Sequence, residues 1–221
     1  MLNNPSVPYI APFITFMVML AIQKNLAFLG DWEYAVRVLI VAASIWYFSR
    51  RVLDFKVRFL AGSIAIGIGV FVLWIAPDTL FPGWRQHWLF TNSLMGEVKV
   101  SLTAEQLSSP FLLTFRTLSA SLMVPILEEL FWRAWMLRWL VDKDFEKLPM
   151  GASDRQSFWI VAALFALEHG PYWEVGLLTG LIYNWWMTRT KSLGDLIFVH
   201  GLTNLVLSLY VIWSKKWQFW M

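Results

Sequence analysis

Long apolar runs, separated by short polar stretches, alternate along most of the chain. Within these runs the apolar residues cover every face of a helix, which is typical of helices buried in a bundle or in a membrane. The pattern predicts seven helical segments: residues 10–22, 32–48, 59–75, 111–141, 157–169, 173–188 and 193–213. Residues 111–141 are long enough to tilt or to kink at Pro125, and residues 157–169 are short for a free-standing span.

The composition indicates that these helices lie in a membrane. Hydrophobic residues make up 58% of the 221 residues and charged residues only 15%, and the mean hydropathy is +0.55. A soluble domain usually carries about a quarter charged residues, whereas the 15 Trp residues of this chain suit repeated contact with the bilayer interface. We therefore predict an all-α, polytopic membrane helix bundle of about seven or eight helices. The length fits a single integral membrane domain over residues 1–221.

Charge and cysteine content exclude several classes of protein. The net charge of +3 is small and dispersed, without the basic stripe that a nucleic-acid partner requires. The absence of cysteine excludes disulfides, thiolate metal sites and a cysteine nucleophile. The lipid bilayer is the partner that the composition does predict.

The basic residues predict an orientation in the membrane. By the positive-inside rule, the basic stretches at residues 50–58 and 138–155 lie in the cytoplasm, and residues 77–109 lie outside. Lys215 and Lys216 fit this orientation less well. The first basic residue, Lys24, follows the first apolar run, so we expect that run to remain as a helix rather than to be cleaved as a signal peptide.

Three clusters of polar residues interrupt the apolar segments. An ionisable side chain in hydrocarbon is costly unless it is paired or lines a wet cavity. In the first cluster, Glu129 and Arg133 are four residues apart with the acid first, the favourable order for an ion pair on one helix face. Glu128 lies about 100° around the helix and is left over. We therefore interpret Glu129 and Arg133 as a supporting pair and Glu128 as a functional acid.

The second and third clusters lie on later segments. His169 follows Phe165 by four residues at the end of an apolar helix, and His200 and Asn204 are also four residues apart. Counted from the predicted cytoplasmic ends, Glu128, His169 and Asn204 each lie 12 residues deep. This is about 18 Å, and His200 lies one turn shallower. Side chains from three helices are therefore predicted to meet in one layer of the bundle.

A carboxylate and an imidazole that meet in such a cavity can activate a water molecule. Glu128 can accept its proton while His169 orients it and later donates to a leaving amine. Donors on His200 and Asn204 can stabilise the oxyanion of a tetrahedral intermediate. The same atoms allow a zinc site, in which Glu128, His169 and His200 bind Zn²⁺ with one open position. Neither H-E-x-x-H nor G-x-S-x-G occurs, so spacing alone leaves both kinds of hydrolysis open.

Together these motifs resemble the CPBP family, which includes the type II CAAX prenyl proteases and bacteriocin-processing or immunity proteins and is also called the Abi family. The resemblance rests on E-E-x-x-x-R at residues 128–133, F-x-x-x-H at 165–169 and H-x-x-x-N at 200–204. R-T-K-S-L at 189–193 is similar to the R-T-G-S-L of the family, with Lys191 where Gly is usual. The resemblance covers residues 118–209, and residues 1–110 are expected to form accessory helices.

The resemblance implies an intramembrane endopeptidase that cuts a membrane-associated protein or peptide. In the family pattern, Glu128 and His169 activate water, and His200 and Asn204 stabilise the oxyanion. Between this glutamate-type mechanism without a cofactor and a zinc enzyme, we favour the former. The compact length and Trp-rich outer segment also resemble a bacterial branch found alongside exosortase sorting systems, which implies a bacterial inner membrane.

Two other classes of protein fit the same clusters. A non-enzymatic immunity or scaffold protein would use the polar groups to bind a peptide or a membrane partner. A proton-coupled transporter would use the buried Glu and His residues as a relay, although the sequence has no inverted repeat. Glu168 is a weaker candidate acid than Glu128, because it points about 100° away from His169 on its helix.

Other polar and aromatic residues are interpreted as structural. Trp132 and Trp135 flank the Glu128 cluster and are predicted to shape the wall of the site. His87, Arg116 and Lys24 are interpreted as interface or snorkelling residues.

Overall fold

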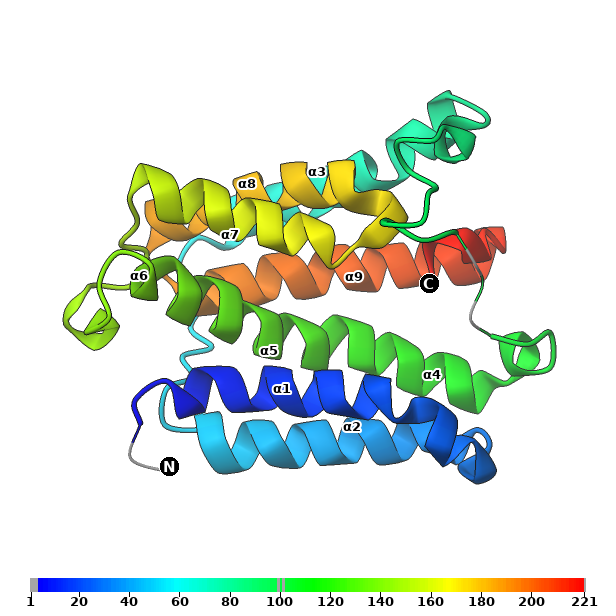
Figure 1. The fold of residues 1–221 in the computed structure, drawn as a ribbon, viewed down its shortest axis with the longest axis horizontal. Helices are drawn as coiled ribbons and strands as arrows, with labels where there is room; N and C mark the ends of the chain where they lie inside the picture. The colour runs from blue at the N-terminus through cyan, green and yellow to red at the C-terminus, as the bar shows by residue number, and fades with distance from the viewer. Residues whose placement is uncertain (1–3, 99, 101, 221) are drawn as a thin grey trace.

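The described part of the chain folds into helices and the segments that connect them (Figure 1). The computed structural model describes residues 4–98, 100 and 102–220, and no β-strand occurs among these residues. The predicted all-α membrane helix bundle is therefore confirmed. Its α-helices are α1 (Val7–Ala21), α2 (Trp32–Ser44), α3 (Leu60–Leu80), α4 (Pro110–Leu118), α5 (Val124–Glu129), α6 (Leu137–Trp139), α7 (Arg155–Leu167), α8 (Trp173–Thr190) and α9 (Leu193–Ser214).

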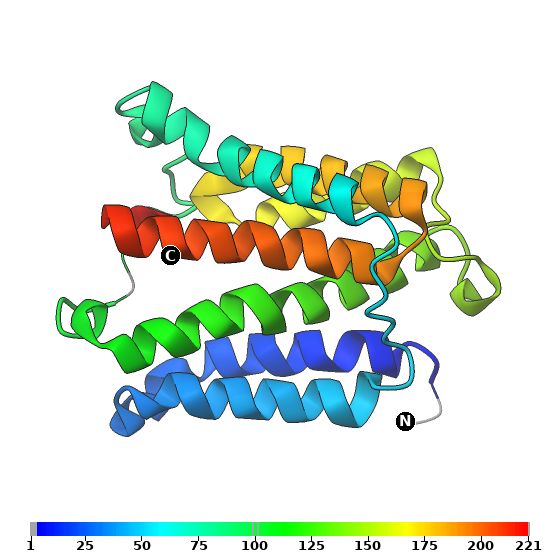
Figure 2. The same cartoon turned by 180° about the vertical axis from the view of Figure 1, so that it is seen from behind.

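The helices lie in layers around α9. The α1–α2 hairpin forms one side of the bundle, and α4, α5 and α6 run beside it. The central α9 follows, and α3, α7 and α8 form the opposite side (Figure 1, Figure 2). Because α9 contacts both α5 and α8, it can bring polar residues of the third cluster close to those of the other two.

The α4, α5 and α6 helices are parts of one continuous helix, Pro110–Trp139. Two π-helical segments connect them, η5 (Ser119–Met123) and η6 (Leu130–Met136). The π turn η5 directly precedes Pro125, where the sequence analysis allowed a kink. Proline has no N–H to offer the carbonyl of Ser121 four residues earlier, and the widened η5 turn absorbs this lost hydrogen bond while the helix continues.

Small residues allow close packing between the helices. A Cβ atom on Gly67 of α3 would lie 3.1 Å from the carbonyl oxygen of Val199 on α9. One on Gly180 of α8 would lie 3.1 Å from the Cα of Ala162 on α7. Close backbone approach at small residues is a common basis of helix association in membranes.

Within the part of the chain that the structure describes, three helices can cross a membrane by length and composition: Leu60–Leu80, Pro110–Trp139 and Leu193–Ser214. A fourth span results if α1 and the bent segment η1 (Gln23–Leu29) count as one. The chain is an integral membrane protein. The shorter helix α7 turns into α8 before reaching the level at which α9 ends (Figure 1).

The loops gather at two ends of the bundle. The basic segments around residues 50–58 and 141–154 lie at the same end, together with the α8–α9 connection (Figure 1). The segment from α3 to α4 and the end of α9 lie at the other. This arrangement agrees with the grouping of loops in the predicted orientation, and the side of the membrane that each end faces stays a prediction.

Candidate active site

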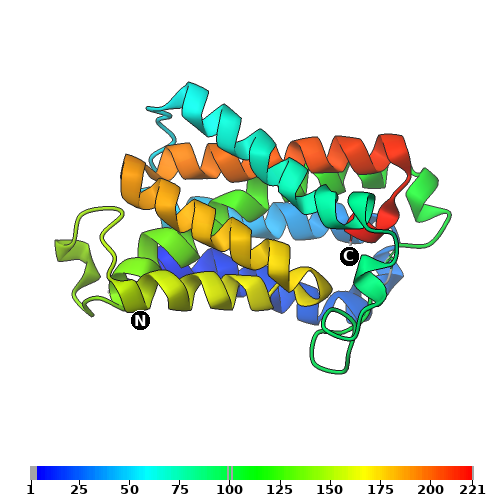
Figure 3. The ribbon, with the colours of Figure 1, turned by 90° about the horizontal axis from the view of Figure 1, so that it is seen from above.

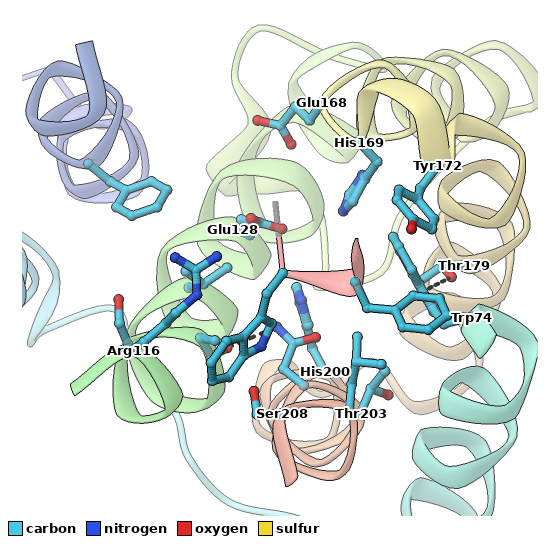
Figure 4. A pocket seen from close by; sticks show the side chains of 18 of the residues that line it. Trp74, Arg116, Glu128, Glu168, His169, Tyr172, Thr179, His200, Thr203 and Ser208 are labelled. Carbon is cyan, nitrogen blue, oxygen red and sulfur yellow. Dashed lines mark hydrogen bonds between the residues drawn. The ribbon is translucent and has the colours of Figure 1, made fainter. Parts of the chain in front are cut away.

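A cavity of about 540 Å³ opens among the helices and is lined by several polar side chains (Figure 4). Its lining includes two carboxyl groups, two imidazoles and two carboxamides, which belong to Glu128, Glu168, His169, His200, Gln23 and Asn204. The four candidate catalytic residues therefore line one cavity, from α5, the turn after α7, and α9. Around them the lining is largely apolar and aromatic, which lowers the local dielectric constant and strengthens electrostatic interactions.

Glu128 faces this cavity from the C-terminal half of α5. Its Oε2 atom is buried and has no hydrogen-bond partner among the described residues. The predicted Glu129–Arg133 ion pair is present next to it, with 3.2 Å between Oε1 and Nη1 and both side chains fully buried. Figure 4 shows Glu128, His169 and His200 turned toward the same space. A buried carboxylate oxygen without a protein partner, facing two imidazoles, is available to a ligand or a water molecule.

His169 lies in the turn that follows α7. Its Nδ1 is 2.7 Å from the carbonyl oxygen of Phe165, and because a carbonyl only accepts, Nδ1 carries the hydrogen. In the neutral imidazole, Nε2 is then a hydrogen-bond acceptor. Trp74 of α3 contacts the imidazole ring, with 5.2 Å between the ring centroids. Gly176 leaves space for the imidazole, since a Cβ at this position would lie 3.2 Å from Nδ1.

His200 contacts an acid that the spacing of residues did not assign to it. Its Nδ1 lies 2.7 Å from Oε1 of Glu129, the same oxygen that Arg133 contacts. Arg133 in turn donates from Nε to Asn184 of α8 at 3.1 Å. The sequence predicts only the pairing within the helix, because residue spacing shows which face a side chain occupies but not which helix packs against that face.

The hydrogen bond to Glu129 constrains the chemistry of His200. With Nδ1–H donating to a carboxylate, Nε2 carries a hydrogen only when the ring is an imidazolium. His200 can therefore donate to an oxyanion from Nε2 only in its charged form.

Asn204 lies one turn further along α9. Its Nδ2 donates to the carbonyl of Ala120 in η5 at 2.8 Å. A carboxamide nitrogen has two hydrogens, so one remains for a group in the cavity. The π turn places this carbonyl opposite α9, and π turns inside α-helices are often found at functional sites.

Glu168 also lines the cavity. Its Oε2 accepts a hydrogen bond from Nε1 of Trp132 at 2.9 Å. Trp132 thus holds an acid of the cavity lining, and Trp135 donates to Ser6 at 3.0 Å. The two tryptophans were predicted to shape the wall of the site, and neither is part of the lining.

Arg116 was interpreted as a snorkelling residue, and the structure places it in the cavity lining. It donates to the hydroxyl of Tyr34 on α2, and its guanidinium lies 5.1 Å from the Trp220 ring. Arg37 of α2 lines the same region and pairs with Glu33 at 3.3 Å. No sequence signal had linked this N-terminal arginine to the cavity, because its contact with the later helices is long-range.

The zinc alternative names Glu128, His169 and His200 as ligands, and these three residues share the cavity. Among the described residues, no group of three His, Asp or Glu side chains lies close enough to hold a metal ion as the structure stands. The hydrogen bond of His200 Nδ1 with Glu129 leaves Nε2 of His200 open toward the cavity.

The fold and the cavity define a class: a membrane helix bundle with an acid–imidazole site suited to hydrolysis inside the bundle. Comparison with known protein families gives a match for part of the chain. Residues 110–206 match the family described as type II CAAX prenyl endopeptidase Rce1-like. This match supports the resemblance to the CPBP, type II CAAX prenyl protease-like family, and the matched region holds all four candidate catalytic residues. No curated protein and no solved structure matches the chain.

Proposed function

We propose that the protein is an intramembrane endopeptidase that hydrolyses a peptide bond of a membrane-associated protein or peptide. The observation that carries this proposal is the buried Oε2 of Glu128, which has no partner among the described residues and faces His169 and His200 in one cavity. Structural carboxylates in low-dielectric surroundings are paired, as Glu129 is, so an acid left open to a cavity is better explained by chemistry than by packing.

The attacking water binds between Glu128 and His169. It donates one hydrogen bond to Oε2 of Glu128 and one to Nε2 of the neutral His169, which turns a lone pair toward the scissile carbonyl. As the water oxygen bonds to the carbonyl carbon, Glu128 takes its proton as a general base. When the carbon–nitrogen bond breaks, this proton goes to the leaving amine, and the products are an amine and a carboxylic acid that keeps the second proton of the water.

The oxyanion of the tetrahedral intermediate is stabilised from α9. Asn204 supplies the second hydrogen of its carboxamide, and His200 supplies Nε2–H as an imidazolium held by Glu129. An oxyanion donor contributes about 2.7–4 kcal/mol to lowering the barrier. Glu129 and Arg133 therefore act as positioning residues, through His200. The mechanism needs no metal ion.

A membrane-associated substrate fits the position of the cavity. The family implies such a protein, and residues of all three helices that can cross a membrane line the cavity. Together with the resemblance of the Trp-rich segment to a bacterial branch, this favours a role in processing a membrane protein in a bacterial inner membrane.

The proposal is tested by searching for new peptide termini. Membrane proteins from the host are incubated in vesicles with the wild-type protein, with Glu128→Gln, or with the surface control Glu146→Gln, and the termini are read by mass spectrometry. We expect termini produced by the wild type and by Glu146→Gln that are lost with Glu128→Gln. If all three proteins give the same termini while Glu128→Gln is folded, the protein is a binding or scaffold protein and the proposal is wrong.

A further inference from the structure

The turn that carries His169 lies against a segment from the first half of the chain. We call this segment, residues 81–96, the strap; it follows α3 and runs beside the turn between α7 and α8 (Figure 3). Trp173 donates from Nε1 to the carbonyl of Leu89 at 3.0 Å. Gly170 has φ +48°, and a Cβ there would lie 2.9 Å from the carbonyl oxygen of Met95. The strap backbone thus packs directly on the turn. Glycine is favoured at position 170 both by the positive φ and by the close approach of the strap backbone.

Arg85 is the centre of the contacts between the strap and the turn. The side chain is buried, with 8% exposed. Its Nε donates to Asp78 of α3 at 2.9 Å, and its Nη1 donates to Glu174 of α8 and to the carbonyl of Pro171, each at 2.7 Å. One guanidinium therefore joins α3, the strap, the turn and the start of α8. Charge-assisted bonds of this kind are about twice as strong as neutral ones.

A stack of rings connects Arg85 to His169. The guanidinium lies 3.9 Å from the centroid of the Tyr172 ring, in the range of a cation–π contact. Tyr172 stacks on Trp74 at 5.9 Å, and Trp74 contacts the imidazole of His169 at 5.2 Å. Trp74 is fixed in turn by a hydrogen bond to Thr179 at 2.9 Å. Arg85 therefore reaches His169 both through the backbone of the turn and through aromatic side chains.

We propose that Arg85 is a positioning residue for His169: the strap uses its guanidinium to hold the α7–α8 turn so that Nε2 of the imidazole faces Glu128. This inference rests on the proposed function for its link to catalysis. Arg85 and the strap lie outside residues 110–206, the part that matches the family. The catalytic geometry of the matched region is thus completed by a segment of the N-terminal half.

The test compares Arg85→Lys and Arg85→Ala with Arg58→Gln, whose side chain is half exposed and pairs only at the surface with Asp54. With a substrate identified by its new termini, Arg85→Ala is expected to lower kcat at least about tenfold with little change in KM, because small displacements of catalytic groups are costly. Lys keeps the charge but not the forked geometry of the guanidinium, so the kcat of Arg85→Lys is expected to lie between those of Arg85→Ala and the wild type. Added guanidinium ion is expected to restore part of the activity of Arg85→Ala only.

A second readout does not depend on activity. Hydrogen exchange of residues 168–174 is expected to speed up in Arg85→Ala and to slow again when guanidinium ion is added. If Arg85→Ala matches Arg58→Gln in kcat, or if guanidinium ion restores neither kcat nor exchange protection, Arg85 is not a positioning residue. If instead the wild type and Glu128→Gln are equally inactive, the proposed function fails, and the exchange data alone decide whether Arg85 holds the turn.

Discussion

Glu129 connects the supporting ion pair to the catalytic residues. Its Oε1 contacts Nη1 of Arg133 at 3.2 Å and Nδ1 of His200 at 2.7 Å, and its side chain has no exposed surface. One buried carboxylate oxygen therefore contacts both the Arg133 guanidinium and the His200 imidazole. The acid that the sequence analysis interpreted as supporting thus orients His200 by accepting a hydrogen bond from its Nδ1.

Replacing Glu129 separates stability from activity. Glu129→Gln leaves the Arg133 charge buried and unpaired, which is expected to cost about 3–5 kcal/mol of folding stability. The double variant Glu129→Gln with Arg133→Met removes both charges, so stability should largely return. Activity should stay low in both, because the His200 imidazolium has lost its counter-ion. Unfolding midpoints and kcat measure the two effects; recovery of activity together with stability would mean that Glu129 has only a structural role.

At this scale the sequence predicts the ion pair within one helix and the meeting of the four candidate residues, but not which side chains bond to each other across helices. The spacing of Glu129 and Arg133 was enough to predict their ion pair, which is present. The contact of His200 with Glu129 and the place of Arg116 in the cavity depend on how helices far apart in sequence pack together. Such long-range packing leaves no periodic signal in the chain.

At the scale of elements, the approach of α9 to η5 sets the position of Asn204. A Cβ on Gly201 would lie 2.8 Å from the carbonyl oxygen of Ser121. Gly201→Ala is therefore expected to push α9 away, weaken the bond from Asn204 to Ala120, and lower kcat at least about tenfold. Gly69→Ala is the matched control, since a Cβ there meets nothing within 4 Å. Equal kcat values for the two variants would show that this close approach is not needed.

The start of α7 gives a prediction for pH. The side chain of Asp154 accepts the backbone N–H of Ser157 at 2.7 Å in a capping box, and this bond lowers the pKa of Asp154. Because the pKa is lowered in the folded state, the cap stabilises the fold fully when the pH is above the ordinary Asp pKa of about 3.9. This stabilisation is lost as the pH falls through the lower pKa of the folded protein. Asp154→Asn keeps a cap without this titration.

We therefore expect the unfolding midpoint of the wild type to fall more steeply below about pH 4 than that of Asp154→Asn. Asp142→Asn, in the exposed loop before α7, is the control and should follow the wild type. The midpoint is measured by thermal unfolding in detergent across this pH range. Identical curves for Asp154→Asn and the wild type would contradict the role of the cap.

The apolar pattern predicts the long helices well and their local irregularities poorly. All seven predicted segments correspond to helical parts of the structure. Hydrophobic periodicity does not report the missing N–H at Pro125 or the packing between helices. These two features decide the π turns at η5 and η6 and the ends of α7.

For the whole molecule, the N-terminal half contributes more to the cavity than the sequence indicates. Residues 1–110 were expected to be accessory helices, yet Trp74 contacts His169, Arg37 lines the cavity, and the strap holds the catalytic turn. The motifs of the matched region mark the reacting groups, while the walls around them come from both halves. The organisation as a single domain stays a prediction.

The mechanism without a metal ion makes a prediction for chelation. Prolonged treatment with a chelator of divalent cations, followed by its removal, is expected to leave cleavage of an identified substrate within about twofold of the untreated rate. Loss of a catalytic metal would remove several kcal/mol of transition-state stabilisation and would lower the rate far more. Loss of cleavage that returns on addition of Zn²⁺ would instead support the zinc mechanism.

The central claim, that Glu128 activates the water that cleaves the peptide bond, is tested most directly by the kinetics of Glu128→Gln on one identified substrate in vesicles. We predict that kcat falls at least about 100-fold, the scale of general base catalysis, while substrate binding and the unfolding midpoint remain close to those of the wild type and of Glu146→Gln. A folded Glu128→Gln protein that cleaves within about threefold of the wild-type rate, far inside that range, would contradict the claim.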